Sequence, residues 1–274
     1  MQRSNNLYRP IETEVLGIVT ESPTIKTLHL KPKEDIVFET GQFIELTILG
    51  VGEAPFTPSS SPAIKDTMEV TIMKVGKVTD EVHKLRKGDI IGLRGPYGKG
   101  YPLSDFKDKE VLVLGGGVGL APLRSLLYAL FNTIADYKKI YFRYGAKTPE
   151  DIIYKNEVKD WLDRKDLDSR IAVDKAEKSW KGHVGLVTTI LDGMKIDHKK
   201  AIGIVCGPPI MMKFSTFKLL ELGFKEENIY LSMEKNMSCG IGKCGHCRIG
   251  TYYACKDGPV FTYDKIKDFP QIWD

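Results

Sequence analysis

The sequence lacks the features that would indicate a membrane or nucleic-acid-binding protein. No run of about 18 or more apolar residues occurs, so no transmembrane helix is expected. The amino terminus, MQRSNN, has no apolar segment of the kind that a secretory signal requires. The formal net charge is only +4, and lysine and arginine are scattered, which argues against nucleic-acid binding. We expect a cytoplasmic protein in a reducing compartment, which reaches a membrane only through partners.

Cysteine is also scarce, yet four of the five cysteines lie close together near the carboxyl end. Cys239, Cys244, Cys247 and Cys255 have the spacing C-x4-C-x2-C-x7-C. The first two intervals are those of the plant-type [2Fe–2S] loop. Glycines between the cysteines permit tight turns, so that four thiolates can converge on one small inorganic core. The spacing predicts a [2Fe–2S] cluster held by these four residues, and hence a protein that transfers single electrons.

A structural zinc site and free thiols are the alternatives for these cysteines. Zinc sites built from four cysteines usually show two well-separated C-x2-C pairs, whereas only one such pair occurs here. Disulfides are not expected without a secretory signal, and Cys206 lies far away in an apolar stretch. His246 lies inside the loop, and because four cysteines are available we place it outside the ligand set.

The chain of 274 residues is long enough for two domains and an appendage. Residues 1–103 are rich in short β-branched runs between proline and glycine, which predicts a small antiparallel β-barrel. Its one predicted helix covers residues 79–86, with Thr79 as N-cap. The predicted strands are 14–20, 25–30, 42–49, 68–75 and 90–94.

Residues 104–235 alternate strands with helices, which predicts a doubly wound parallel sheet covered on both faces. Residues 236–274 form the third unit, a small iron–sulfur module. In the second unit the predicted strands are 111–114, 139–144, 170–173, 202–205 and 229–232, and the predicted helices are 121–133, 154–164, 186–191 and 208–222.

A glycine cluster, G-G-G-V-G-L-A-P at 115–122, follows the first of these strands and opens a helix. Glycines let the backbone approach a pyrophosphate, and the helix amino terminus offers free N–H groups. Pro122 is placed as a first helical residue would be. The position between strand and helix favours nucleotide binding over a turn that only packs helix on strand. The residues expected to contact the nucleotide here are Gly115, Gly116, Gly117, Gly119, Ala121 and Pro122.

A second strand-to-helix junction lies at Cys206, Gly207 and Pro208. In a doubly wound sheet the carboxyl ends of the strands gather at one edge, so this turn should face the same crevice as the glycine cluster. For Cys206, a contact with nicotinamide and a small buried apolar side chain are equally good interpretations. No acidic residue closes the next strand to hold a ribose, and Lys147 lies there instead, so NADH and NADPH both remain possible.

These motifs occur in a fixed order that resembles the ferredoxin–NADP reductase superfamily over nearly the whole chain. They are P-F-T-P-S-S at 55–60, the glycine cluster, and C-G-P-P at 206–209. The appended cysteine loop resembles the electron-transfer subunits of anaerobic multi-subunit enzymes: the gamma subunit of NiFe hydrogenases (sulfhydrogenases), and the corresponding subunits of anaerobic sulfite reductase and of dihydroorotate dehydrogenase B. The tail D-F-P-Q-I-W at 268–273 favours the first two.

The resemblance implies FAD in the barrel. The barrel motif of the superfamily is commonly R-x-[YF]-[ST]; Phe56 and Thr57 match it, but Ala54 stands where the arginine is expected. The FAD pyrophosphate would then rely on backbone N–H groups, for which the turn before the barrel's helix is suited. The residues implied for FAD are Pro55, Phe56, Thr57, Pro58, Ser59, Met73, Gly76, Val78 and Thr79.

The three sites together predict an oxidoreductase subunit that passes electrons between NAD(P)H and a partner through FAD and the cluster. The expected partners are the catalytic and iron–sulfur subunits of a hydrogenase or of a sulfite or sulfur reductase. The alternatives are the electron-transfer subunit of dihydroorotate dehydrogenase B and, from another class, a nucleotide-binding regulator that is stabilised by zinc. Hydride transfer to a flavin needs no acid–base residue, so no catalytic side chain is assigned.

Overall fold

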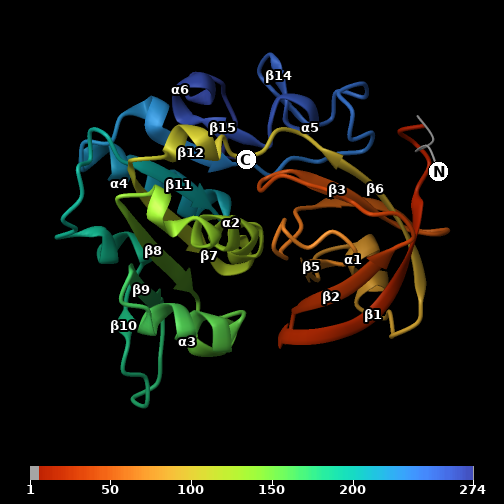
Figure 1. Ribbon diagram of the computed structural model, residues 1–274, viewed down its shortest axis with the longest axis horizontal. Helices are drawn as coiled ribbons and strands as arrows, with labels where there is room; N and C mark the ends of the chain where they lie inside the picture. The colour runs from red at the N-terminus through yellow and green to blue at the C-terminus, as the bar shows by residue number, and fades with distance from the viewer. Residues whose placement is uncertain (1–5, 274) are drawn as a thin grey trace.

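An antiparallel sheet of six strands forms the first part of the chain in the computed structural model, which describes residues 6–273 (Figure 1). Its strand order is β4-β3-β6-β1-β2-β5. A bridge between Pro58 and Val70 then joins the continuation of β4 to β5 and closes the sheet into a barrel. The strands are β1 (Ile11–Ser22), β2 (Ile25–Pro32), β3 (Phe43–Ile48), β4 (Gly52–Phe56), β5 (Met68–Met73) and β6 (Ile90–Tyr97).

The one helix of the barrel, α1 (Lys77–Val82), begins earlier than the sequence predicts. Gly76 is its N-cap, so the prediction that Thr79 caps the helix is wrong. Thr79 lies inside the first turn, and its hydroxyl accepts the N–H groups of Val75 and Gly76 at 2.8 and 2.9 Å. The threonine therefore stabilises the turn from within rather than from the cap position.

A seven-stranded sheet follows, in the order β10-β9-β8-β7-β11-β12-β15. All neighbours pair in parallel except β15, which runs antiparallel to β12. The strands are β7 (Glu110–Gly116), β8 (Lys139–Ala146), β9 (Leu167–Val173), β10 (His183–Val184), β11 (Ile202–Cys206), β12 (Ile229–Ser232) and β15 (Val260–Thr262). Buried apolar side chains pack on both faces of the sheet, as its near-continuous apolar strands require.

Helices α2 (Leu120–Asn132), α3 (Lys155–Asp163) and α4 (Pro209–Glu221) cover this sheet. Pro122 is the third residue of α2 rather than the first, since Gly119 is the N-cap. The segment predicted as a helix over 186–191 is the 3-10 helix η5 (Val187–Leu191), whose β-branched residues disfavour an α-helix. The remaining 3-10 helices are η1 (Leu103–Phe106), η2 (Gly117–Gly119), η3 (Ile134–Asp136), η4 (Pro149–Asp151) and η6 (Glu226–Asn228).

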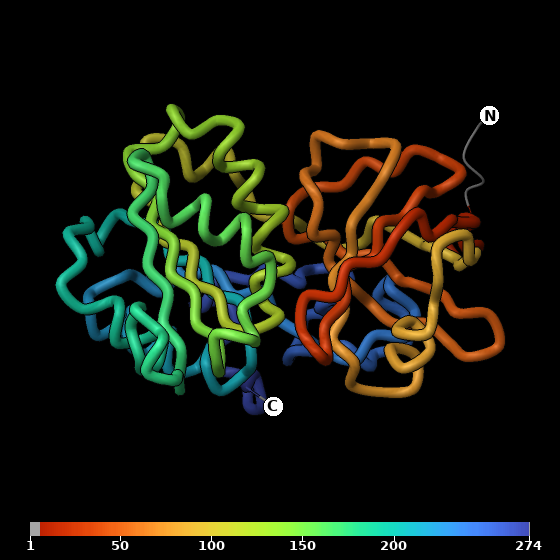
Figure 2. Tube along the Cα trace, turned by 90° about the horizontal axis from the view of Figure 1, so that it is seen from below, coloured from red at the N-terminus to blue at the C-terminus, as the bar shows by residue number. Residues whose placement is uncertain are grey.

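The carboxyl-terminal segment lies along both domains (Figure 2). It contains the hairpin of β13 (Arg248–Ile249) and β14 (Tyr252–Tyr253) and the short helices α5 (Ala254–Asp257) and α6 (Tyr263–Ile266). Its strand β15 extends the parallel sheet, and its buried side chains share one core with Phe43 and Tyr97 of the barrel. None of the helices in residues 6–273 combines the length and the hydropathy that crossing a bilayer requires.

Candidate electron-transfer site

The cysteine loop wraps backbone N–H groups around the sulfur of Cys239. The amides of Ile241, Lys243 and Cys244 point at this sulfur from 3.4, 3.3 and 3.4 Å. Burial alone would raise the pKa of the Cys239 thiol, but these N–H groups outweigh it and lower the pKa to about 6. A thiol with a lowered pKa is readily deprotonated, and the thiolate is the form that ligates iron.

Cys255 joins the loop from further along the chain. Its sulfur accepts the N–H of Gly242 at 3.0 Å and lies 3.2 Å from the sulfur of Cys247. Burial and the neighbouring Cys247 thiol raise the pKa of Cys255 to about 12. Cys255 therefore keeps its proton at neutral pH until a metal displaces it.

The cysteines of the loop differ in their exposure to solvent. Cys244 is exposed, whereas Cys239, Cys247 and Cys255 are buried. His246 is exposed and pairs with the hydroxyl of Ser238 at 2.8 Å. Within residues 6–273 no group of three or more His, Cys, Asp or Glu side chains gathers around one point that could hold a single ion. The donor set still suits an iron–sulfur cluster, because sulfurs that receive several N–H groups are typical of such sites.

The glycine cluster and the C-G-P-P turn meet at the carboxyl ends of β7 and β11. A Cβ atom at Gly119 would lie 2.6 Å from the carbonyl oxygen of Cys206 and from Cα of Gly207, so glycine is required for this contact. Gly117 has a φ of +53°, and no atom lies within 4 Å of the position that its Cβ would take. The structure thus brings together the two predicted halves of the nucleotide site and leaves space beside Gly117.

An acidic residue does lie at this edge of the sheet, one strand beyond the position that the sequence analysis considered. β8 ends at Ala146, whose carbonyl oxygen accepts the N–H of Asp174 at 3.0 Å just after β9. Asp174 and the following Lys175 are both exposed. The sheet order, which cannot be read directly from the sequence, places this carboxylate beside Lys147 at the edge where nucleotides bind.

The barrel motif runs across the seam where the barrel closes. Phe56 is partly buried against the barrel core, and Thr57 is partly exposed. Pro58 and Ser59 are buried, and the Ser59 hydroxyl lies 3.1 Å from that of Thr71. Ser59 therefore faces the protein interior, whereas Pro55, Phe56 and Thr57 are only partly buried.

The first turn of α1 lies next to β4, because a methyl carbon of Val78 is 3.4 Å from the position that a Cβ of Gly52 would take. Gly76 is exposed with no atom within 4 Å of its Cβ position, and Met73 and Val75 expose apolar side chains at 38% and 71%. An exposed apolar strip beside open backbone is suited to a ligand with an apolar ring and a phosphate. These residues fit FAD, although Ala54 supplies no cation.

Buried charged groups join the barrel to the cysteine loop, and the sequence analysis did not identify them. Glu45 of β3 is fully buried, and neither of its carboxylate oxygens has a hydrogen-bond partner among the described residues. Burial raises the pKa of Glu45 to about 7, against the opposing charge of Arg94. The side chain of Arg94 on β6 is likewise almost fully buried and pairs with Glu53.

A second buried arginine joins the barrel to the nucleotide-binding domain. Arg124 of α2 pairs with Glu69 of β5 and with Glu157 of α3. Its guanidinium also lies 3.4 Å from the carbonyl oxygen of Ser59 in the barrel motif. This contact ties the helix that follows the glycine cluster to the seam of the barrel.

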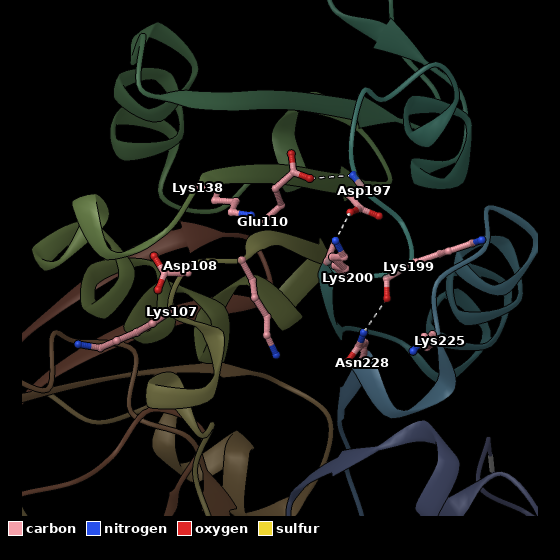
Figure 3. A pocket seen from close by; sticks show the side chains of 11 residues that line it. Lys107, Asp108, Glu110, Lys138, Asp197, Lys199, Lys200, Lys225 and Asn228 are labelled. Atoms are coloured by element: carbon pink, nitrogen blue, oxygen red, sulfur yellow. Dashed lines mark hydrogen bonds and ion pairs between the residues drawn. The ribbon is translucent and has the colours of Figure 1, made fainter.

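The pocket shown in Figure 3 lies at the opposite edge of the parallel sheet. Glu110 begins β7 there, whereas the glycine cluster follows its other end. Six lysines and three acidic residues line the pocket; the N–H of Asp197 donates to the Glu110 carboxylate at 2.7 Å, and the Asp197 side chain lies 3.9 Å from that of Lys200. This pocket is separate from all three predicted cofactor sites.

Three protein families match successive parts of the chain. The oxidoreductase FAD-binding domain matches residues 14–101, the oxidoreductase NAD-binding domain residues 113–216, and the iron–sulfur cluster binding domain of dihydroorotate dehydrogenase B residues 234–267. Together they cover the barrel, most of the parallel sheet and the cysteine loop.

Similar proteins span nearly the same length. The sulfhydrogenase 2 gamma subunit of Pyrococcus furiosus is 36% identical, over 94% of this chain and 96% of its own. A probable dihydroorotate dehydrogenase B (NAD(+)) electron transfer subunit of Methanocaldococcus jannaschii is also 36% identical, over 95% and 93%. The chain belongs to the ferredoxin–NADP reductase superfamily, in the branch with a carboxyl-terminal iron–sulfur domain.

Solved structures of the superfamily agree with this fold. A structure described as NADH-dependent reduced ferredoxin-NADP oxidoreductase, in work on flavin-based electron bifurcation, superimposes with a TM-score of 0.76 at 27% identity over 93% of this chain and 91% of its own. A ferredoxin NADP+ reductase from Neisseria gonorrhoeae gives a TM-score of 0.71 at 20% identity, over 80% and 96%. The chain is an NAD(P)H-dependent flavin and iron–sulfur oxidoreductase subunit with an electron-transfer role.

Proposed function

We propose that this chain carries electrons between NAD(P)H and a partner redox subunit through one FAD and one [2Fe–2S] cluster. The observation that supports this most strongly is the cysteine loop, in which four N–H groups point at the sulfurs of Cys239 and Cys255. A bound flavin accepts both electrons of a hydride and releases them singly, whereas a [2Fe–2S] cluster takes one at a time. The residues of the chain bind, orient and shield these groups.

We assign the cluster to four cysteine ligands. Cys239, Cys244, Cys247 and Cys255 would hold it, and Cys244 is the ligand nearest to solvent. The match to an iron–sulfur domain speaks against the zinc alternative. Ordered N–H groups around the sulfurs favour the negatively charged, reduced form of such a site.

We assign the nicotinamide nucleotide to the crevice between the two glycine-containing turns. The backbone of Gly115, Gly116, Gly117 and Gly119 would receive the pyrophosphate at the amino end of α2. Ala121 and Pro122 continue this end of the helix, while Cys206, Gly207 and Pro208 form the opposite wall. The close contact between Gly119 and Gly207 supports a single site rather than two.

We assign FAD to the seam of the barrel. Pro55, Phe56 and Thr57 would contact the flavin, with Pro58 and the buried Ser59 supporting them from behind. Gly76, Val78 and Thr79 would lie at the phosphates and Met73 beside them, since this turn adjoins β4. The absence of a cation at Ala54 leaves backbone N–H groups to bind the pyrophosphate.

The partner is proposed to be the catalytic and iron–sulfur subunits of a hydrogenase-type or sulfite- or sulfur-reductase complex in the cytoplasm. The 36% identity to sulfhydrogenase gamma subunits over nearly the full chain supports the hydrogenase type. The equal identity to the probable dihydroorotate dehydrogenase B electron transfer subunit of Methanocaldococcus jannaschii favours a second candidate, in which the partner oxidises dihydroorotate.

Native co-purification distinguishes these candidates. The partner that accompanies a tagged chain purified from its own anaerobically grown cells would be identified. The complex would then be assayed for hydrogen-dependent and dihydroorotate-dependent reduction of NAD(P)+, and for NAD(P)H-dependent reduction of sulfite or sulfur. We expect activity with one of these substrates and only dye reduction by the isolated chain. A lone monomer that converts a small metabolite without a partner would contradict the proposal.

A further inference from the structure

Arg94 connects the strand of the flavin motif with the first cysteine of the loop. Its Nε and Nη2 donate to the two carboxylate oxygens of Glu53 at 2.9 and 2.5 Å. Its Nη1 lies 3.4 Å from the carbonyl oxygen of Cys239. Glu53 is on β4, three residues before Phe56, so one guanidinium contacts both the flavin strand and the cysteine loop.

The other contacts of Arg94 fix its orientation. Nη1 also lies 3.1 Å from the Tyr97 hydroxyl and 3.2 Å from the Leu7 carbonyl oxygen. The Tyr97 hydroxyl in turn donates to that same carbonyl at 2.6 Å. Every nitrogen of the guanidinium therefore has a protein acceptor, and Arg94 is not a substitute for the arginine that is missing at Ala54.

The cysteine loop is seated closely on this part of the barrel. Gly240, directly after Cys239, has a φ of +72°, and a Cβ there would lie 3.0 Å from the ring of Tyr97 and 3.5 Å from Cγ of Glu45. Arg94 and Glu45 thus lie buried against the loop, and Glu53, whose side chain is 27% exposed, pairs with Arg94.

The charged side chains beside Cys239 lie close enough to affect the reduction potential of a cluster bound by the loop. One-electron reduction of a cluster held by the four cysteines would add one negative charge at this place, and the electron would come from the oxidation of NAD(P)H. A buried cation beside the first ligand favours this added charge, and a buried carboxylate opposes it. Solvent screens the charge of Arg94 weakly, because its side chain is 3% exposed, and screens that of Glu53 more, because its side chain is 27% exposed.

We propose that the Arg94–Glu53 pair is a positioning and charge-setting element for the iron–sulfur cluster. It holds the Cys239 end of the loop against the flavin strand, and its two charges set the reduction potential of the cluster in opposite directions. This inference rests on the proposed function, since it requires that the four cysteines hold a cluster.

Redox titration of the purified full-length protein, followed by the paramagnetic signal of the reduced cluster, tests the pair. Arg94→Gln leaves the charge of Glu53 uncompensated, so the equilibrium constant for reduction of the cluster should fall about tenfold. For a one-electron couple this lowers the reduction potential by about 59 mV. Glu53→Gln should shift the potential upward. The double variant should return to within about threefold of the wild type, because both charges are gone.

Arg94→Lys separates charge from geometry. Lysine keeps the positive charge but cannot form the bidentate contact with Glu53, so the potential should recover at least half of the Arg94→Gln shift. Arg164→Gln, which breaks an exposed pair with Asp166, is the control and should not move the potential.

The outcomes are distinguishable. Opposite shifts in the two single variants support the proposal. Shifts in the same direction, or unmoved potentials in variants that retain iron and sulfide, overturn it while leaving the proposed function intact. A wild-type protein without iron and sulfide would overturn the proposed function itself and this inference with it.

Discussion

The sulfurs of Cys247 and Cys255 lie 3.2 Å apart, although seven residues separate them in the chain. The hairpin of β13 and β14 brings them together, since Arg248 pairs with Tyr253 and the N–H of Ala254 donates to the carbonyl of Cys247 at 3.0 Å. The last cysteine therefore reaches the loop through a built turn rather than by chance proximity.

Replacing Cys255 by serine should remove or weaken the cluster. Serine is a poorer iron ligand, and the buried position offers no substitute thiol. We expect iron to fall well below two per chain, or an altered paramagnetic signal, with flavin content unchanged. Cys206→Ala is the matched control, because Cys206 is also buried but is assigned here to the proposed nucleotide crevice. Equal loss of iron in both variants would contradict the assignment.

Gly117→Val should weaken NAD(P)H binding selectively. The φ of +53° at Gly117 strains any β-branched residue, and the new side chain would point into the open space where the pyrophosphate is expected. We expect the KM for NAD(P)H to rise by at least about tenfold with flavin and iron content retained, equivalent to about 1.4 kcal/mol of binding. Gly193→Ala, at a positive φ in a loop between η5 and β11, controls for backbone strain alone. An unchanged KM would show that the nucleotide lies elsewhere.

Asp174 should disfavour NADPH. An exposed carboxylate at the carboxyl end of β9 would repel a 2′-phosphate and can accept hydrogen bonds from a ribose diol. Asp174→Asn should therefore raise kcat/KM for NADPH relative to NADH by several-fold, measured with an artificial acceptor. Lys175→Gln, the neighbouring change of opposite charge, should move this ratio the other way. A ratio unaffected by both variants would exclude this edge as the ribose site.

Glu45 should make the stability of the protein depend on pH. Its pKa is raised from 4.5 to about 7 in the folded protein, so the folded state binds more protons than the unfolded state between these values. The protonated carboxyl therefore contributes its full share to the free energy of unfolding below about pH 4.5. This contribution is lost as the pH rises to 7, and at about 1.4 kcal/mol per pKa unit the loss is roughly 3 kcal/mol.

Glu45→Gln removes this dependence, because the amide does not ionise. The urea concentration at the midpoint of unfolding should rise for the variant relative to the wild type as the pH rises from 4.5 to 7. The difference between the two should then level off. Glu81→Gln, on the exposed face of α1, provides the comparison. A constant difference between Glu45→Gln and the wild type across this range would show that Glu45 does not ionise there.

Local sequence signals predicted much of this structure. The glycine cluster and the cysteine spacing are contiguous motifs, and their strand, turn and helix follow from neighbouring residues. The contact between Arg94 and Cys239 could not be predicted in this way, because 145 positions separate the two residues and no sequence pattern contains both. The same holds for Asp174, whose place depends on the order of β8 and β9 in the sheet.

Two local errors have physical causes. Thr79 is a good N-cap residue, but Gly76 can adopt the extended conformation that starts α1 one turn earlier, and the threonine hydroxyl then serves the turn from inside. Strand β15 is short, and it pairs with β12 only because Gly258 and Pro259 bring the chain back to the sheet, where the N–H of Met233 donates to Pro259. Neither the cap at Gly76 nor the pairing of β15 with β12 leaves a periodic signal in the sequence.

The central claim is that electrons from NAD(P)H reach the cysteine loop within this chain. The most direct measurement is anaerobic addition of NADH or NADPH to the purified protein, with flavin absorbance and the paramagnetic signal of the reduced cluster recorded together. We expect the flavin to bleach and a [2Fe–2S] signal to develop toward one spin per chain, with Cys255→Ser bleaching but showing no such signal. Bleaching of the flavin in a wild-type protein that contains iron and sulfide, with no reduction of the cluster at any NAD(P)H concentration, would contradict the account.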